Sequence, residues 1–182
     1  MNASQHTNNA KSNRPRLAPL LRRAWYGLNQ TFRRRIAESG ITPDQFTILR
    51  WLDEHPDGLT QRALADLMAS DPNTVTAILT RMQKSGLIER RPHADDARCN
   101  LIALKNKGRA LHADLQPRAS ELQQQLLAVI PSSKQAEFLK YLGAICAALE
   151  TDAPPTKREP SAHLSRQALT PREIIGHKQK HR

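Results

Sequence analysis

The chain has few of the features that mark secreted, disulfide-stabilised or membrane proteins. It contains only 2 cysteines, Cys99 and Cys146, and its first sixteen residues are polar, without the apolar segment of a signal peptide. Its longest unbroken apolar run, residues 144–149, is far shorter than the roughly 18–20 residues that a membrane-spanning helix needs. We therefore expect a cytoplasmic protein with free thiols and no membrane partner.

The sequence also lacks the short motifs of common enzyme classes. It has no G-x-x-x-x-G-K-[ST] or G-x-G-x-x-G loop for phosphates or dinucleotides, and its 7 histidines are scattered, without metal-ligand spacing. No nucleophile stands in a recognisable pattern with an acid or a base. These absences predict a protein that is not an enzyme and has no cofactor, no catalytic residue and no metal site.

Positive charge is what the chain has in excess. It carries 28 Lys and Arg against 17 Asp and Glu, for a formal net charge of +11. The charge is concentrated in residues 72–109 and in both ends of the chain, residues 1–16 and 151–182. Clustered positive charge of this kind is typical of proteins that bind a polyanion.

The apolar spacing predicts a mainly helical domain with a small β-hairpin. The predicted elements are helices at 17–38, 42–55, 60–69, 72–85, 106–130 and 132–149, strands at 87–91 and 100–104, and a strand of one or two residues at Leu59. Thr42, Pro43 and Gln45 form a capping box that begins the second helix, and Gly40 and Gly86 follow helix ends. We expect disordered basic tails at 1–16 and 151–182 around one domain, residues 17–150.

Two short helices, a tight break, a further helix and a basic hairpin are the order of a winged helix-turn-helix. The helix at 72–85 has an apolar stripe of Val75, Ile78, Leu79 and Met82. Its other face is polar and suits the DNA major groove; it carries Asn73, Thr74, Thr76, Ala77, Thr80, Arg81 and Lys84. A solvent-exposed helix face with no partner would have a similar composition, so this face alone does not decide the function.

The hairpin supplies a second group of basic residues. Arg90, Arg91 and Arg98 flank a polar loop that also carries Asp96, and arginines so placed suit the DNA backbone or minor groove. An ordinary hairpin with solubilising charge is the alternative. We expect Arg98 to contact phosphate or the minor groove and Asp96 to orient it.

Four segments together resemble the MarR family of bacterial transcriptional regulators. They are ITPDQFTILRWL, GLTQRALADLM, NTVTAILTRMQKSGLIERR and DDARCNLIALKNKG, the last with the family's Asp-x-Arg at Asp96 and Arg98 and its Leu-x-x-x-Gly at Leu104 and Gly108. The resemblance covers 17–150 and implies a DNA-binding lobe at about 42–105. It also implies a homodimer formed by N- and C-terminal dimerisation helices, at about 17–38 and 106–150, on a palindromic double-stranded operator.

The resemblance further implies a repressor that a small aromatic or phenolic ligand releases from DNA. The side chains expected to line the ligand cleft are Trp25, Tyr26, Phe46, Arg50, Trp51 and His55, with Arg50 or His55 as the partner of a carboxylate. Aromatic residues at helical spacing are also common in cores, so the same residues have a purely structural interpretation. The alternative function is a winged-helix module that binds RNA or another protein and has no operator specificity.

Overall fold

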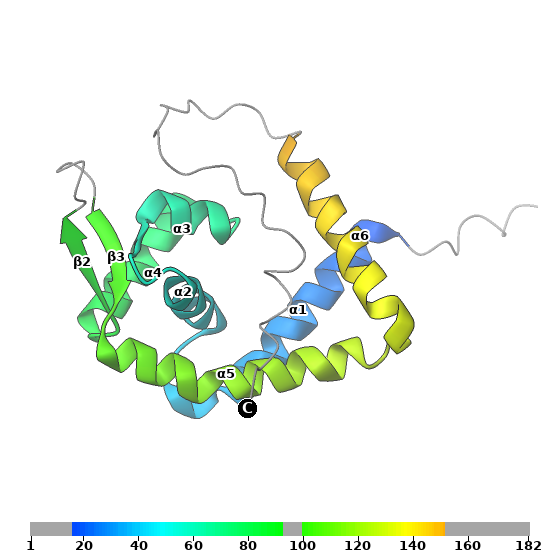
Figure 1. Ribbon diagram of the computed structural model, residues 1–182, viewed down its shortest axis with the longest axis horizontal. Helices are drawn as coiled ribbons and strands as arrows, with labels where there is room; N and C mark the ends of the chain where they lie inside the picture. The colour runs from blue at the N-terminus through cyan, green and yellow to red at the C-terminus, as the bar shows by residue number, and fades with distance from the viewer. Residues whose placement is uncertain (1–15, 93–99, 152–182) are drawn as a thin grey trace, which may run out of the picture. The chain divides into compact units, whose positions relative to one another are not determined.

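A computed structural model of the chain describes residues 16–92 and 100–151. The elements, drawn in Figure 1, are α1 (Leu17–Arg35), the 3-10 helix η1 (Ala37–Ser39), α2 (Pro43–Glu54), β1 (Leu59–Thr60), α3 (Gln61–Leu67), α4 (Pro72–Lys84), β2 (Ile88–Pro92), β3 (Asn100–Leu104), α5 (Asn106–Leu127) and α6 (Ser132–Thr151). The fold is mainly α with a small antiparallel sheet, as predicted. The chain divides after Leu122 into two compact units, each described by itself below.

The predicted start of α2 is confirmed in detail. The backbone N–H of Gln45 donates to Thr42 Oγ1 at 3.3 Å, and the backbone N–H of Thr42 donates to Gln45 Oε1 at 2.9 Å. Pro43 occupies the first turn, where its missing N–H costs nothing. Gly40 precedes this cap with a φ of 72°, a left-handed conformation that favours glycine. The preceding helix is shorter than predicted, because α1 ends at Arg35 and continues only as η1.

The three strands form one sheet in the order β1-β3-β2, and both pairings are antiparallel. In the hairpin, Ile88 on β2 pairs with Leu104 on β3. β3 is the central strand and lies between the 2-residue β1 and the 5-residue β2. Gly108, at the start of α5, packs so closely on the Leu87 carbonyl that a Cβ there would collide with it. The Leu-x-x-x-Gly pattern therefore has a steric reason in this chain.

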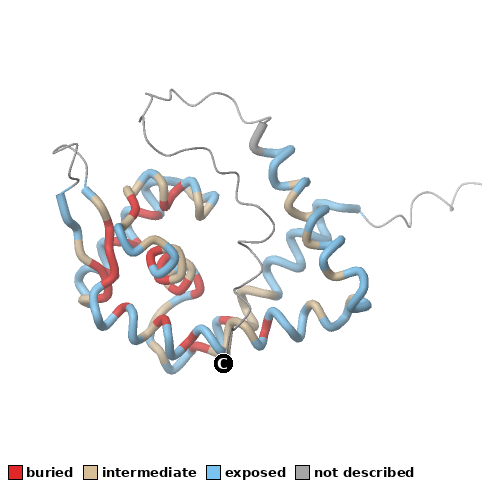
Figure 2. The backbone as a smooth tube through the Cα atoms, viewed as in Figure 1, coloured by how far each residue is buried: buried red, intermediate tan, exposed pale blue. Residues whose placement is uncertain are grey.

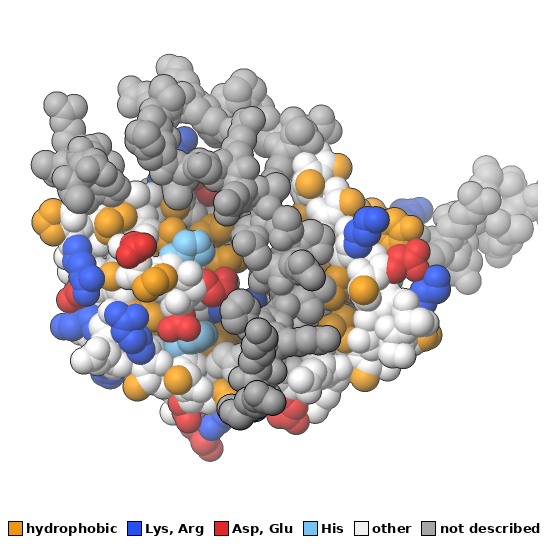
Figure 3. Space-filling model, viewed as in Figure 1, with side chains coloured by type: hydrophobic (Ala, Val, Ile, Leu, Met, Phe, Trp, Pro, Cys, Tyr) orange, Lys and Arg blue, Asp and Glu red, His pale blue; other side chains and the backbone are white. Residues whose placement is uncertain are grey.

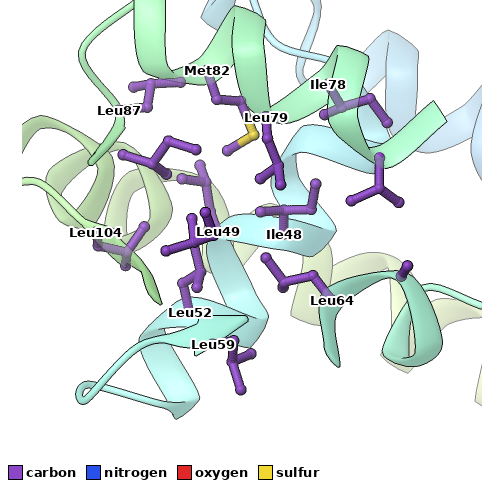
Figure 4. Close-up of a cluster of buried hydrophobic side chains, with 14 residues drawn as sticks. Ile48, Leu49, Leu52, Leu59, Leu64, Ile78, Leu79, Met82, Leu87 and Leu104 are labelled. Carbon is purple, nitrogen blue, oxygen red and sulfur yellow. The ribbon is translucent and has the colours of Figure 1, made fainter. Parts of the chain in front are cut away.

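Two hydrophobic clusters hold the first unit together. The larger joins α2, α3, α4 and the sheet, and it contains the predicted stripe of α4 (Figure 4). The smaller joins α1, α2 and α5 through Phe32, Ile36, Phe46, Leu115 and Leu122. At about 25 cal/mol per Å² of apolar surface removed from water, these clusters supply most of the favourable free energy of folding.

The described residues of the second unit, 123–151, contain no such core. From Ser132 to Leu149, α6 has no buried residue. Figure 2 draws buried residues in red, and this helix carries no red there, in contrast to the helices and strands of the first unit. Its apolar side chains Phe138, Tyr141 and Leu149 are exposed, as are Leu126 and Val129 before it. The described residues include no helix that is long and apolar enough to cross a membrane.

Candidate nucleic-acid interface

The polar helix α4 is fixed at its start by a side-chain cap. Asp71 Oδ1 accepts hydrogen bonds from the backbone N–H groups of Asn73 at 2.8 Å and Thr74 at 3.3 Å, and Pro72 opens the first turn. α3 begins in a similar way, with Thr60 Oγ1 accepting from the backbone N–H of Ala63 at 3.1 Å. α3 ends at Leu67 and α4 begins after its Asp71 cap, which leaves a short break between the two helices, where Ala69 adopts a φ of 46°.

The two faces of α4 separate as the sequence predicts. Val75, Ile78, Leu79 and Met82 are buried in the larger cluster. The predicted DNA-reading side chains are all exposed; they are Asn73, Thr74, Thr76, Ala77, Thr80, Arg81 and Lys84. Exposure is required for contact with a base edge, and the buried stripe fixes the direction in which this face points.

Two hydroxyl groups on this face donate their protons into their own helix. Thr76 Oγ1 donates to the Pro72 carbonyl at 2.7 Å, and Thr80 Oγ1 donates to the Thr76 carbonyl at 2.8 Å. Arg81 Nε is held in the same way by the Ala77 carbonyl, at 3.2 Å. Such i to i−4 bonds are common for Thr in helices, and they leave the two hydroxyl oxygens able to act only as acceptors towards other groups.

Arg90 connects the wing to the helix-turn-helix. Its Nε donates to Gln83 Oε1 on α4 at 3.2 Å, and its Nη2 donates to Gln61 Oε1 on α3 at 3.4 Å. Gln61 Nε2 in turn donates to Thr76 Oγ1 at 2.7 Å. Sequence reasoning missed Gln61, because its partners lie 15 and 29 positions away along the chain and no local pattern marks them.

Arg91 lies on the other face of the hairpin, because neighbouring side chains of a strand point to opposite sides. Its Nε donates to Glu89 Oε1 at 2.6 Å. Both side chains line a hollow of about 410 Å³ together with Lys105, Lys107 and Arg109 at the start of α5. In Figure 3, Lys and Arg side chains gather beside the hairpin and this start of α5. The structure therefore separates Arg90 from Arg91, which the sequence analysis treats as one group.

Asp96 and Arg98, the two charged residues of the Asp-x-Arg pattern, lie outside the described residues. Their assignment to DNA contact stays a prediction. Within 16–92 and 100–151, no group of three or more His, Cys, Asp or Glu side chains is arranged to hold a metal ion.

The six side chains expected to line a ligand cleft occupy three different environments. Trp25 and Tyr26 on α1 are 64% and 65% exposed, whereas Phe46 is only 6% exposed. Phe46 is part of the core of the first unit, because its ring packs edge-on against Phe32 with centroids 4.9 Å apart. Its assignment to a ligand cleft stays a prediction.

The remaining three cleft candidates lie near the end of α2 and have partners there. Arg50 Nε donates to Glu54 Oε1 at 2.9 Å. His55 Nδ1 lies 2.7 Å from the Trp51 carbonyl, and the two rings are 6.3 Å apart. Neither the hollow beside the wing nor a second one, between the start of α2 and the end of α4, is lined by any of the six candidates.

His112 on α5 is a buried polar residue that no sequence pattern marks. Its Nδ1 lies 3.3 Å from Asp53 Oδ2 on α2, and its ring lies 5.6 Å from that of Phe46. Its Nε2 has no hydrogen-bond partner among the described residues. His112 therefore links α5 to α2 inside the first unit.

Comparisons with known proteins agree with this arrangement. Residues 41–100 match the MarR family. The chain is 34% identical over 112 residues to the organic hydroperoxide resistance transcriptional regulator of Bacillus subtilis, covering 61% of this chain and 71% of that protein. It is 30% identical over 111 residues to the homoprotocatechuate degradative operon repressor of Escherichia coli, covering 61% and 74%.

A solved structure shows the same fold. The S. aureus MepR–DNA complex superimposes with a TM-score of 0.69 at 23% identity, over 74% of this chain and 99% of that one. The expectation that the chain is not an enzyme is confirmed by its relatives, which are transcriptional regulators. The capped α4, the three-stranded sheet and the matched residues 41–100 lead to one conclusion: the chain belongs to the MarR family of transcriptional regulators.

Proposed function

We propose that the protein is a repressor that binds a palindromic double-stranded DNA operator as a homodimer. The exposed polar face of α4 carries this proposal, because it presents hydroxyl and amide groups on a rigid, capped helix with Arg81 and Lys84 in its last turn. A helix of this kind fits the major groove, about 12 Å wide, where such groups reach base edges and phosphates. The superimposable MepR structure is named as a complex with DNA.

Exposed apolar side chains support the homodimer. On α1 they are Leu17, Leu20, Leu21, Trp25 and Tyr26; on and just before α6 they are Leu126, Val129, Phe138, Tyr141 and Leu149. Soluble chains rarely leave so many large apolar side chains in water, and a second copy of the same chain is the commonest cover for them. The proposed dimerisation helices are the predicted ones, at about 17–38 and 106–150.

A small aromatic or phenolic acid is the proposed effector. One relative is named as the repressor of a homoprotocatechuate degradative operon, and homoprotocatechuate is itself a phenolic acid. The exposed rings of Trp25 and Tyr26 and the cationic side chain of Arg50 are the groups that would receive an aromatic carboxylate. Glu54 engages only the Nε of Arg50, which leaves the other N–H groups of the guanidinium as donors for such a ligand.

The test is selection of bound duplexes from a randomised library, followed by titration of the best duplex and a scrambled one. We expect a palindrome whose half-site centres lie roughly 10–10.5 base pairs apart, bound by two chains. Aromatic carboxylates added to the complex should then release the duplex. Enrichment of no palindrome, with equal affinity for the scrambled duplex, would favour the RNA-binding or protein-interaction alternative.

A further inference from the structure

The hydrogen bonds around Thr76 run in one direction from the wing to the recognition helix. Arg90 Nη2 donates to Gln61 Oε1 at 3.4 Å, and Gln61 Nε2 donates to Thr76 Oγ1 at 2.7 Å. Thr76 Oγ1 then donates to the Pro72 carbonyl at 2.7 Å. The order is set by chemistry, because a guanidinium has only donors and therefore fixes the carbonyl side of the Gln61 amide towards itself.

This order restricts what Thr76 has left to offer DNA. A hydroxyl has one proton and two lone pairs. In Thr76 the proton is engaged by Pro72, and one lone pair is engaged by Gln61. The remaining lone pair can accept a hydrogen bond and cannot donate one. To donate a hydrogen bond to DNA, Thr76 would have to give up its bond to the Pro72 carbonyl, because that bond uses its only proton.

We propose that Gln61 and Arg90 are positioning residues that hold in place the Oγ1 of Thr76, whose proton the Pro72 carbonyl engages, as an acceptor-only reader of bases. This inference rests on the proposed binding of α4 in the major groove. The donors displayed there are the exocyclic amino groups of adenine (N6) and cytosine (N4). Guanine O6 and thymine O4 would meet the Thr76 oxygen as a second acceptor and leave both groups without a hydrogen bond. Thr76 therefore selects adenine or cytosine at the position it faces.

The same contacts assign Arg90 a role other than phosphate binding. Its Nε is held by Gln83 on α4 and its Nη2 by Gln61 on α3, so one side chain connects β2 to both helices of the helix-turn-helix. Arg91, one residue further along β2, pairs instead with Glu89 on the opposite face. Arg90 and Arg91 thus form a matched pair, with equal charge on the same strand but different partners.

The experiment compares Arg90→Ala, Gln61→Leu and Arg91→Ala in the full-length chain. Each variant is titrated with the selected operator and with duplexes that carry a single base change under Thr76, at several salt concentrations. In the wild type the adenine or cytosine duplex should bind roughly 3- to 10-fold more tightly than its guanine or thymine counterpart, the size of one neutral hydrogen bond. Arg90→Ala and Gln61→Leu should both lose this preference, and Arg91→Ala should keep it.

Two further readouts separate positioning from a loss of structure or of charge. Thermal melting of all three variants should match the wild type within a few degrees, since the substituted side chains are surface groups. The Arg90→Ala, Gln61→Leu double variant should lose no more preference than either single variant, because both break the same chain of bonds.

The opposite pattern would overturn the inference. If Arg90→Ala weakened every duplex equally and lowered the salt slope by about one unit while the base preference persisted, Arg90 would be a phosphate contact. An unchanged preference in Gln61→Leu would equally remove Gln61 from the mechanism. Failure of the proposed function would give a different result, because the wild type itself would then bind all the duplexes with equal affinity.

Discussion

The lobe formed by α2, α3, α4 and the sheet and the C-terminal unit around α6 use apolar residues in opposite ways. In the lobe the helical stripes are closed off from water, and Leu49, Leu64, Val75 and Leu79 are 0% exposed. On α6 the apolar stripe is just as regular, yet none of the residues of this helix from Ser132 to Leu149 is buried. Periodicity alone therefore reveals that a helix has an apolar face, and only the packing shows whether its own chain covers that face.

This contrast separates two sources of stability. The lobe contains its own core, so its folding free energy should not depend on protein concentration. The exposed apolar side chains of α1 and α6 can contribute only when a second surface covers them, which makes their contribution depend on protein concentration. The predictions below test that separation.

The largest effect is expected in the core of the lobe. Leu79→Ala should lower the free energy of unfolding by about 2–5 kcal/mol at every protein concentration, because it leaves a cavity beneath α4. Urea titrations at two protein concentrations measure this loss. Leu79→Met, which roughly conserves volume, is the control and should cost under about 1.5 kcal/mol. A loss that disappeared at high concentration would contradict the independent core.

A smaller, concentration-dependent effect is expected on the exposed stripes. Leu20→Gln on α1 or Tyr141→Gln on α6 should weaken the homodimer by tenfold or more, which corresponds to roughly 1.4 kcal/mol of lost apolar burial. Sedimentation equilibrium measures the dissociation constant. Lys140→Gln, a substitution of an exposed polar residue on α6, should leave it unchanged. If Lys140→Gln dissociated the dimer as strongly as Tyr141→Gln, the apolar face would not be the interface.

The sequence predicted the lobe well because its signals are local. The capping box at Thr42, the Asp71–Pro72 start of α4 and the glycine at position 86 each act within one turn of helix, and the structure contains all three. The alternating pattern of the strands placed β3 correctly at residues 100–104 and β2 within one residue.

The functional site was less predictable, because its geometry depends on contacts between distant segments. Thr76 and Arg90 were identified from residue type, but the bond that joins them passes through Gln61, which no local pattern marks. The resemblance places Phe46 in a ligand cleft, whereas its burial against Phe32 depends on how α1 crosses α2. Pairwise packing of this kind cannot be read from spacing.

A loss of about 1 kcal/mol is expected when α4 loses its cap. Asp71→Ala removes the acceptor of two backbone N–H groups and should lower the unfolding free energy by that amount. Because the cap fixes the first turn of the reading face, operator affinity should fall more than affinity for a scrambled duplex. Asp66→Ala, on exposed α3 surface, is the matched loss of one carboxylate, and it should change neither quantity by more than about 0.5 kcal/mol.

Arg98→Ala is expected to leave the free energy of unfolding unchanged, and it therefore tests the wing separately from the fold. Arg98 is predicted to contact phosphate or the minor groove, so its loss should weaken operator and scrambled duplex alike and reduce the salt slope by about one unit. Asp96→Ala should produce part of the same change if Asp96 orients the guanidinium. Because counterion release is independent of sequence, base preference should persist in both variants, in contrast to Arg90→Ala. A shift in preferred sequence at constant salt slope would show instead that Arg98 reads bases. The wing would then contribute to specificity through two residues, Arg90 and Arg98.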